Sequence, residues 1–245
     1  MIIEAFNLVF IGLLLFFALL TFLIWYFFRD KSEKFRKHLI IYFSVFNIVF
    51  FFVYKIFLSI DREYLAISNI TSFNWWNELP LQLCNINMFI IPLSLILNKK
   101  FLMGFAFFIA PLGAFMAFLF PETAFSGYSL LLMRNIGFYF THGFIIVLAI
   151  SLCTLGFFKP SFRLIPSICA TLVFLAVIMH GVNMLLRATV CSYTNYFYTF
   201  PVDISLLSLF YQLISIPLLY LLPGLVILGI YAGLITLPFT LKHKE

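Results

Sequence analysis

Long apolar stretches divide the chain into seven runs, each long enough to cross a bilayer as a helix of about 20 residues. The apolar residues are continuous within each run rather than alternating, which indicates helices and not strands. The last run is unusually long and contains Pro217 and Pro223, so we expect it to be kinked or preceded by a short interfacial segment. The runs cover residues 5–28, 39–60, 75–97, 101–120, 133–157, 162–186 and 204–238.

The composition favours a membrane protein. Of the 245 residues, 64% are hydrophobic and 10% are charged, whereas a soluble domain carries roughly 25% charged residues. A chain with so few charges cannot cover a surface that faces water, and in lipid every backbone polar group must be satisfied within a helix or a closed barrel. No Gly/Ser-rich linker, low-complexity tract or internal repeat divides the sequence. We therefore predict an all-α polytopic bundle of seven transmembrane helices, forming one integral membrane domain over residues 1–245.

The charged residues alternate between the loops, and this alternation predicts an orientation. The positive-inside rule makes the basic side cytoplasmic, so we expect the N-terminus outside and the C-terminus inside. The same placement accounts for the net charge of +6, and no nucleic-acid partner is expected. The basic side comprises residues 29–38, Lys99, Lys100, Lys159, Arg163, Lys242 and Lys244. The other side comprises Asp61, Glu63, Glu78, Glu122 and Asp203, with Arg62 and Arg187 as its basic members.

Polar residues interrupt the outer halves of the predicted helices. Such groups are costly in lipid and usually face the bundle interior or a wet cavity. The rise per residue of straight helices places Cys84, His142 and His180 at similar depths. The cations suit an anionic lipid head group, and the absence of a carboxylate at mid-span argues against a proton-coupled transporter. Helical spacing gives three stripes, which are His180, Asn183 and Arg187, then Asn135, Tyr139 and His142, then Glu78, Gln82 and Asn85; Lys55, Cys84, Asn87 and Arg134 complete the layer.

Cys84 has three interpretations. It fills space as a small apolar side chain, it pairs with Cys191 in an outer loop, or it is a nucleophile activated by a base. His142 likewise either hydrogen-bonds a neighbouring helix or acts as that base. Two His and one Cys could ligate zinc, but their spacing matches no zinc pattern, so no metal site is predicted.

Three segments together resemble a known family. They are residues 77–84 (NELPLQLC), 139–143 (YFTHG) and 195–198 (NYFY), with Pro201 following. On a seven-span frame this order resembles the bacterial YwaF-like integral membrane family. That family is similar to a eukaryotic transmembrane acyltransferase, which builds ether phospholipids by moving a fatty acyl chain between phospholipids. The resemblance implies a bacterial plasma (inner) membrane location. Gln82 departs from the usual bacterial pattern, in which a His is often found.

The resemblance also implies an activity, namely acyl transfer from a phospholipid to a lysophospholipid without coenzyme A. Cys84 matches the position of the acyl-accepting nucleophile and His142 that of the base. No cofactor is required, membrane phospholipids are the expected partners, and the oligomeric state stays open. The alternative is a non-catalytic transporter, or a protein that binds lipid or small solutes in the same cationic polar cavity. The predicted substrate-binding residues are Lys55, Asn85, Asn87, Arg134, Asn135, His180, Asn183 and Arg187.

Overall fold

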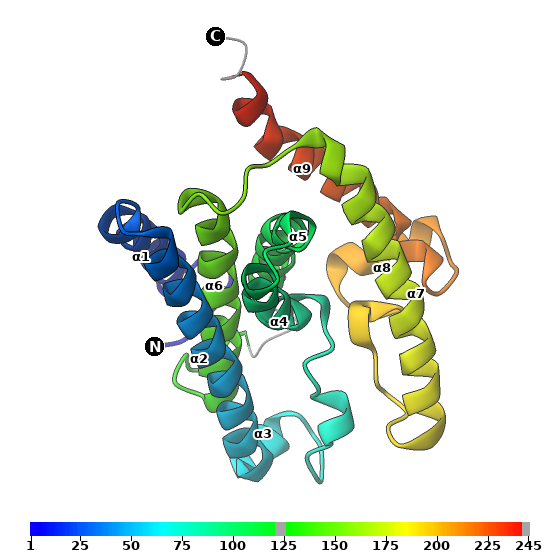
Figure 1. Ribbon diagram of the computed structural model, residues 1–245. Coiled ribbons are helices and arrows are strands. Elements are labelled where there is room, and N and C mark those ends of the chain that lie inside the picture. The colour runs from blue at the N-terminus through cyan, green and yellow to red at the C-terminus, as the bar shows by residue number, and fades with distance from the viewer. Residues whose placement is uncertain (121–125, 242–245) are drawn as a thin grey trace. The chain divides into compact units, whose positions relative to one another are not determined.

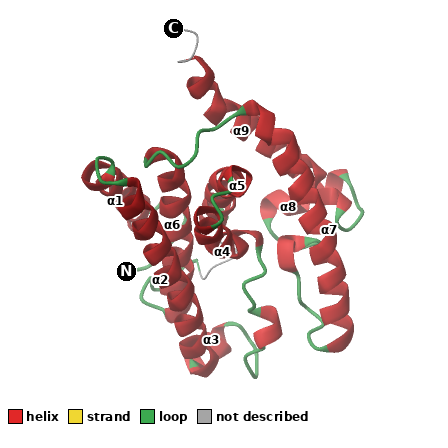
Figure 2. Ribbon diagram, viewed as in Figure 1, coloured by secondary structure: helices red, strands yellow, loops and turns green. Residues whose placement is uncertain are grey.

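The computed structural model describes residues 1–120 and 126–241, which fold almost entirely as helices and connecting turns (Figure 1, Figure 2). Within these residues the β pairing is an isolated bridge between Ile2 and Ser129. The all-α prediction is therefore confirmed. The α-helices are α1 (Leu8–Phe28), α2 (Glu33–Ile60), α3 (Arg62–Ile67), α4 (Leu83–Ile96), α5 (Lys100–Leu119), α6 (Met133–Thr154), α7 (Ile165–Thr189), α8 (Ser205–Leu213) and α9 (Leu222–Leu241). Short 3-10 turns lie at Trp75–Asn77, Phe162–Leu164, Tyr196–Tyr198 and Leu219–Leu221.

In the described part of the chain, six helical segments are long and apolar enough to cross a membrane. These segments contain α1, α2, α5, α6, α7 and α9, and each falls on one of the predicted runs. Helix α4 is apolar but has only 14 residues. Helix α2 begins earlier than predicted, because Ser32 accepts a hydrogen bond from the N–H of Phe35 and caps a polar first turn. Three charges that entered the orientation argument, Glu122, Lys242 and Lys244, lie outside the described residues.

The third apolar run, residues 75–97, is not helical throughout, and this part of the prediction is wrong. Its α-helix is α4, which covers only the second half of the run. Pro80 has no N–H to donate and restricts the residue before it, which disfavours a helix through the Leu-Pro-Leu segment. The predicted stripe of Glu78, Gln82 and Asn85 is also wrong, because the first two residues precede the helix.

The seventh apolar run breaks into α8 and α9, so the expected interruption is confirmed. Pro217 lies in the break, and Leu218 adopts a positive φ of 65° that a right-handed helix cannot contain. The N–H of Leu218 instead donates to the carbonyl of Thr199 at 2.7 Å. Pro223 lies in the first turn of α9, where a missing N–H costs little.

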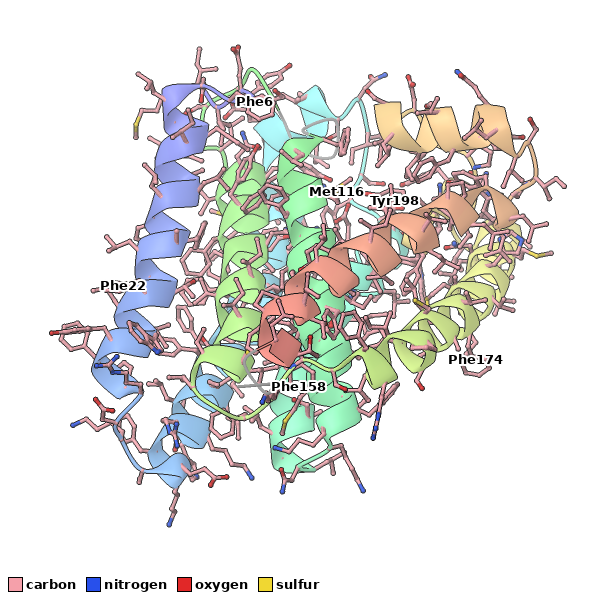
Figure 3. The ribbon with its side chains drawn as sticks, turned by 90° about the horizontal axis from the view of Figure 1, so that it is seen from above. Phe6, Phe22, Met116, Phe158, Phe174 and Tyr198 are labelled. Carbon is pink, nitrogen blue, oxygen red and sulfur yellow. The ribbon has the colours of Figure 1, made fainter. Side chains whose placement is uncertain are left out.

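The contacts of the chain define two compact units, which are described separately. The first comprises residues 1–74 and 84–157, and the second comprises residues 75–83 and the chain from residue 158 onward. In the first unit α6 packs against α1, α2 and α5; in the second, α7 packs against α9. Phe22 on α1 and Phe174 on α7 point outward (Figure 3) and are 51% and 65% exposed. Large exposed apolar side chains are expected of surfaces that face lipid.

Two glycines let neighbouring helices approach α6 closely. A Cβ on Gly137 would lie 2.3 Å from Cδ2 of Tyr54 on α2, and a Cβ on Gly143 would lie 2.1 Å from Cζ of Phe17 on α1. Both aromatic rings are buried. Small residues at helix contacts allow such close packing in membranes. The position of α6, which carries His142 beside Gly143, is thus fixed by contacts on two sides.

Gly137→Ala is expected to lower the free energy of unfolding by about 1–3 kcal/mol, because the added methyl group collides with the packed ring of Tyr54. Gly12→Ala is the matched control, since Gly12 also lies in a helix but nothing is found within 4 Å of its added Cβ. That control should leave stability unchanged or raise it slightly through helix propensity. Thermal unfolding in one detergent measures both variants. Equal melting temperatures for the two would contradict the close contact at Gly137.

Candidate functional site

The first turn of α4 places Cys84 beside His142 of α6. The distance between Cys84 Sγ and His142 Nε2 is 3.2 Å, although the residues are 58 positions apart along the chain. Both belong to the first unit, where His142 is buried and Cys84 is half-buried. The structure therefore brings the predicted nucleophile and the predicted base into hydrogen-bonding contact.

A backbone carbonyl fixes the tautomer of the His142 ring. Its Nδ1 lies 2.7 Å from the carbonyl oxygen of Phe138, one turn earlier in α6. A carbonyl oxygen can only accept a hydrogen bond, so Nδ1 must carry a proton and donate it. In the neutral ring Nε2 then bears a lone pair and accepts from the thiol of Cys84. An imidazole in this arrangement can take a proton from the thiol and generate the thiolate.

Aromatic side chains hold the imidazole of His142 in place. The ring of Phe138 lies against it, with centroids 4.3 Å apart, and the ring of Phe118 on α5 follows at 6.4 Å. Packing on this scale restricts the rotamers of a buried side chain, which keeps Nε2 directed at the sulfur. Phe138 thus contributes twice, through its carbonyl oxygen and through its ring.

Two predicted cationic residues lie in the same unit as the Cys84–His142 pair. Lys55 of α2 is only 3% exposed, and its Nζ lies 5.1 and 5.5 Å from two aromatic rings of its own helix. The guanidinium of Arg134 lies 6.0 Å from the ring of Phe138. Both cations act electrostatically on His142. Positive charge in a buried environment favours an anionic group nearby, such as a thiolate or a phosphate.

The three asparagines predicted in this unit differ in their surroundings. Asn85 follows Cys84, and its Oδ1 lies 3.8 Å from the sulfur. Asn87 is fully buried in α4. Asn135 is also fully buried, and its Nδ2 donates to the carbonyl of Ser129 at 3.0 Å, which ties α6 to the loop before it. Of the three, Asn85 is the residue that contacts the sulfur.

The predicted stripe of His180, Asn183 and Arg187 lies on α7 in the second unit. The ring of His180 and the guanidinium of Arg187 lie 4.8 and 4.6 Å from the ring of Phe200. Asn183 is fully buried, accepts from the N–H of Tyr196 at 2.8 Å and donates to the carbonyl of the same residue at 2.7 Å. The amide of Asn183 is therefore engaged by the chain that follows α7.

All four cysteines are free thiols. The pairing of Cys84 with Cys191, one of the three interpretations of Cys84, is not present in the structure. Among the described residues, no group of three or more His, Cys, Asp and Glu side chains is arranged to hold a metal ion. The contact with His142 Nε2 distinguishes Cys84 from Cys153 and Cys169, which lie elsewhere on α6 and on α7.

The contribution of Phe138 could not have been predicted from the sequence. Every histidine inside a helix has a carbonyl four residues earlier, and His38 makes the same contact with Lys34 at 2.6 Å on the exposed surface of α2. The i−4 spacing is therefore present at both positions. His142 differs from His38 because it is buried and because the thiol of Cys84 lies at its other ring nitrogen. Both differences arise from the fold and not from the local sequence.

Apolar helices that enclose a Cys–His contact define an integral membrane protein with a candidate nucleophilic site. More particularly, the chain belongs to the TMEM164 family, whose model matches residues 3–236, nearly the whole chain. The predicted membership of a membrane protein family is confirmed at this level. Neither the curated proteins nor the solved structures give a match to the chain.

Proposed function

We propose that the protein is a membrane-embedded phospholipid acyltransferase, which moves an acyl chain from a phospholipid to a lysophospholipid through Cys84. The observation that carries the proposal is the 3.2 Å contact between Cys84 Sγ and His142 Nε2, with the opposite ring nitrogen donating to a backbone carbonyl. The resemblance of residues 77–84, 139–143 and 195–198 to acyl-transferring membrane proteins supplies the reaction class. The same resemblance supports our proposal of a bacterial plasma membrane location, which membrane fractionation of the native host would check.

The first half of the reaction loads the acyl chain onto Cys84. Nε2 of His142 takes the thiol proton, and the sulfur attacks the ester carbonyl of the donor phospholipid. The ester C–O bond breaks, and the departing alkoxide takes the proton back from Nε2. The products are a lysophospholipid and an acyl thioester on Cys84. Protons and charges balance without a cofactor.

The second half of the reaction returns the enzyme to its starting state. Nε2 of His142 takes a proton from the hydroxyl of the acceptor lysophospholipid, whose oxygen attacks the thioester carbonyl. The C–S bond breaks, and the thiolate takes the proton from Nε2. Because thioester and oxygen ester exchange directly, coenzyme A has no part in the cycle.

The cations of the first unit are suited to the phosphate of such substrates. Lys55 is buried and Arg134 stands at the start of α6, and both act electrostatically on His142. We assign them the head-group phosphate, because charge-assisted hydrogen bonds to phosphate are strong in a water-poor environment. Asn85 is our candidate donor to the developing oxyanion through its Nδ2, the donor atom of the side-chain amide whose Oδ1 lies 3.8 Å from the sulfur.

A transacylation assay tests the proposal. The purified protein in mixed micelles receives a phospholipid labelled in its acyl chain and an unlabelled lysophospholipid, without coenzyme A. We expect label in the acceptor, and a mass increase on the peptide that contains Cys84 which neutral hydroxylamine removes, as it does for a thioester. Retention of bound phospholipid with no transfer across several head groups, and with Cys84 unmodified, would instead identify a lipid-binding protein.

A further inference from the structure

Tyr139 on α6 is a buried tyrosine whose hydroxyl has no hydrogen-bond partner among the described residues, although its side chain is only 3% exposed. The hydroxyls of Tyr196 and Tyr220, which are at least as well buried, each contact two backbone polar groups within their own unit. Removing a hydroxyl from water without giving it a hydrogen bond is costly. The unpaired hydroxyl of Tyr139 therefore indicates a partner from outside the protein.

The hydroxyl of Tyr139 can be reached although its ring is buried. Thr141, two residues later, also has a hydroxyl without a partner, but that oxygen is enclosed by protein atoms. The oxygen of Tyr139 is not enclosed in this way. A ligand can thus hydrogen-bond Tyr139 without displacing the side chains around it.

Tyr139 lies beside the Cys84–His142 pair within the first unit. Residues three positions apart on a helix are neighbours, so Tyr139 and His142 project from the same side of α6. The ring of Phe118 on α5 supports this placement, because its centroid lies 5.4 Å from the ring of Tyr139 and 6.4 Å from that of His142. One aromatic side chain of the neighbouring helix thus packs against both.

The surroundings of Tyr139 favour a neutral oxygen as its partner. A phenol hydroxyl can donate one hydrogen bond, and the rings that pack against Tyr139 are those of Phe118 and Phe138. A phosphate is better matched by cations, a role that we assign to Lys55 and Arg134. The carbonyl oxygen of an acyl ester is a neutral acceptor, and a donor phospholipid carries it at the bond that the proposed nucleophile attacks.

We propose that the hydroxyl of Tyr139 binds the carbonyl oxygen of the acyl ester and is a further catalytic residue of the site. The proposal deepens the proposed acyltransferase function and rests on it. When the sulfur of Cys84 attacks the carbonyl carbon, an electron pair of the C=O bond moves onto the oxygen. The O–H of Tyr139 donates to this oxyanion and keeps its own proton. The hydrogen bond strengthens as charge develops on the oxygen, and the electron pair returns when the ester C–O bond breaks.

The same hydroxyl serves the second half of the reaction. The carbonyl oxygen of the thioester takes the place of the ester oxygen, and the attack of the acceptor hydroxyl again moves an electron pair onto it. This role also restricts the substrates to lipids with an ester-linked chain at the reacting position, because an ether-linked chain has no carbonyl group.

Tyr139→Phe tests the proposal, since it removes the hydroxyl and keeps the ring that packs against Phe118. We expect kcat for acyl transfer to fall about 10²-fold, as is typical of a lost oxyanion donor, with little change in KM. The melting temperature should not fall, because no hydrogen bond within the described protein is lost. The rate at which iodoacetamide alkylates Cys84, followed on its peptide by mass spectrometry, should stay as in the wild type, because the contact with His142 does not involve this hydroxyl.

Tyr64→Phe is the matched control. Tyr64 is also a buried tyrosine of the first unit, 7% exposed, but it lies on α3 and packs against Phe73 with ring centroids 6.1 Å apart. This variant loses the same hydroxyl group from a different helix, and it should keep the kcat of the wild type.

Infrared difference spectroscopy gives a readout that does not depend on turnover. A donor phospholipid with isotope-labelled ester carbonyls is added to Cys84→Ala, which cannot cleave it. A hydrogen bond lowers the stretching frequency of a carbonyl group. We therefore expect a low-frequency band from the bound lipid that is absent when Tyr139→Phe is added to Cys84→Ala.

The outcomes separate the role of Tyr139 from the acyltransferase itself. Wild-type kcat in Tyr139→Phe, or the same carbonyl band with and without the hydroxyl, would overturn the role of Tyr139 and leave the transfer through Cys84 intact. A fall in melting temperature and a changed alkylation rate that accompany the loss of transfer would overturn it as well, in favour of a structural role. A wild-type protein that transfers no label, but whose bound lipid shows the Tyr139-dependent band, would refute the acyltransferase and leave Tyr139 as a residue that binds lipid esters.

Discussion

Cys84→Ala is expected to abolish acyl transfer, with a loss of roughly 10³-fold or more, because no other group can carry the acyl chain in the proposed cycle. Cys84→Ser should be nearly as inactive, since a serine hydroxyl gives up its proton to a neutral imidazole far less readily than a thiol does. Neither change should unfold the protein, because Cys84 is half-buried and its side chain is small. Radiolabel transfer between lipids in micelles, together with melting temperature, measures both properties.

Cys153→Ala is the matched control for the Cys84 variants. Cys153 is also a half-buried free thiol on a membrane helix, and it lies near the far end of α6 from His142. It should keep wild-type transfer. Equal activity in Cys84→Ala and Cys153→Ala would contradict both the nucleophilic role of Cys84 and the proposed acyltransferase mechanism. Cys84 would then be interpreted as a packing residue.

His142→Ala is expected to lower acyl transfer by about 10² to 10⁴-fold, the range typical of a lost general base. Alkylation of Cys84 at neutral pH should slow as well, because the thiol loses the acceptor that lies 3.2 Å away. His142→Gln separates shape from chemistry, since an amide fills part of the space but cannot take up a proton. It should be as inactive as His142→Ala.

His38→Ala is the control for the histidine variants, because His38 Nδ1 makes the same contact with the carbonyl four residues earlier. It lies on the exposed part of α2 and should transfer acyl groups like the wild type. A loss of transfer in His38→Ala as large as in His142→Ala would show that the assay reports folding and not the base. Full activity in His142→Ala would contradict a catalytic role for the Cys84–His142 pair.

Most of the helices could be predicted because their signal is local. Continuous apolar runs identified α1, α5, α6 and α7 to within a few residues. The start of α4 could not be predicted in this way. The segment before α4 is hydrogen-bonded by Tyr196, which lies 120 positions after Trp76 in the chain. The sequence of residues 75–97 alone does not indicate that this partner exists.

The contact at the candidate site was predicted only in part. The resemblance indicated Cys84 and His142 together, and the depth argument placed them at one level. That argument assumed a straight helix from Trp75, which the structure does not contain, so its agreement with the observed contact has no physical basis. The close approach at Gly137 likewise could not be predicted from the sequence, since Gly12 also lies in a long apolar helix but has no atom within 4 Å of an added Cβ.

The length of α4 bears on the fate of an acyl chain held there. Fourteen residues extend about 21 Å at about 1.5 Å each, against a hydrocarbon core of about 30 Å. If Lys99 and Lys100 stand at the inner boundary, as the positive-inside rule expects, the first turn of α4 would lie within the apolar layer. The thioester that we propose on Cys84 would then encounter lipid hydroxyls more often than water. Such a catalyst would redistribute fatty acids among phospholipids while conserving the number of ester bonds in the bilayer.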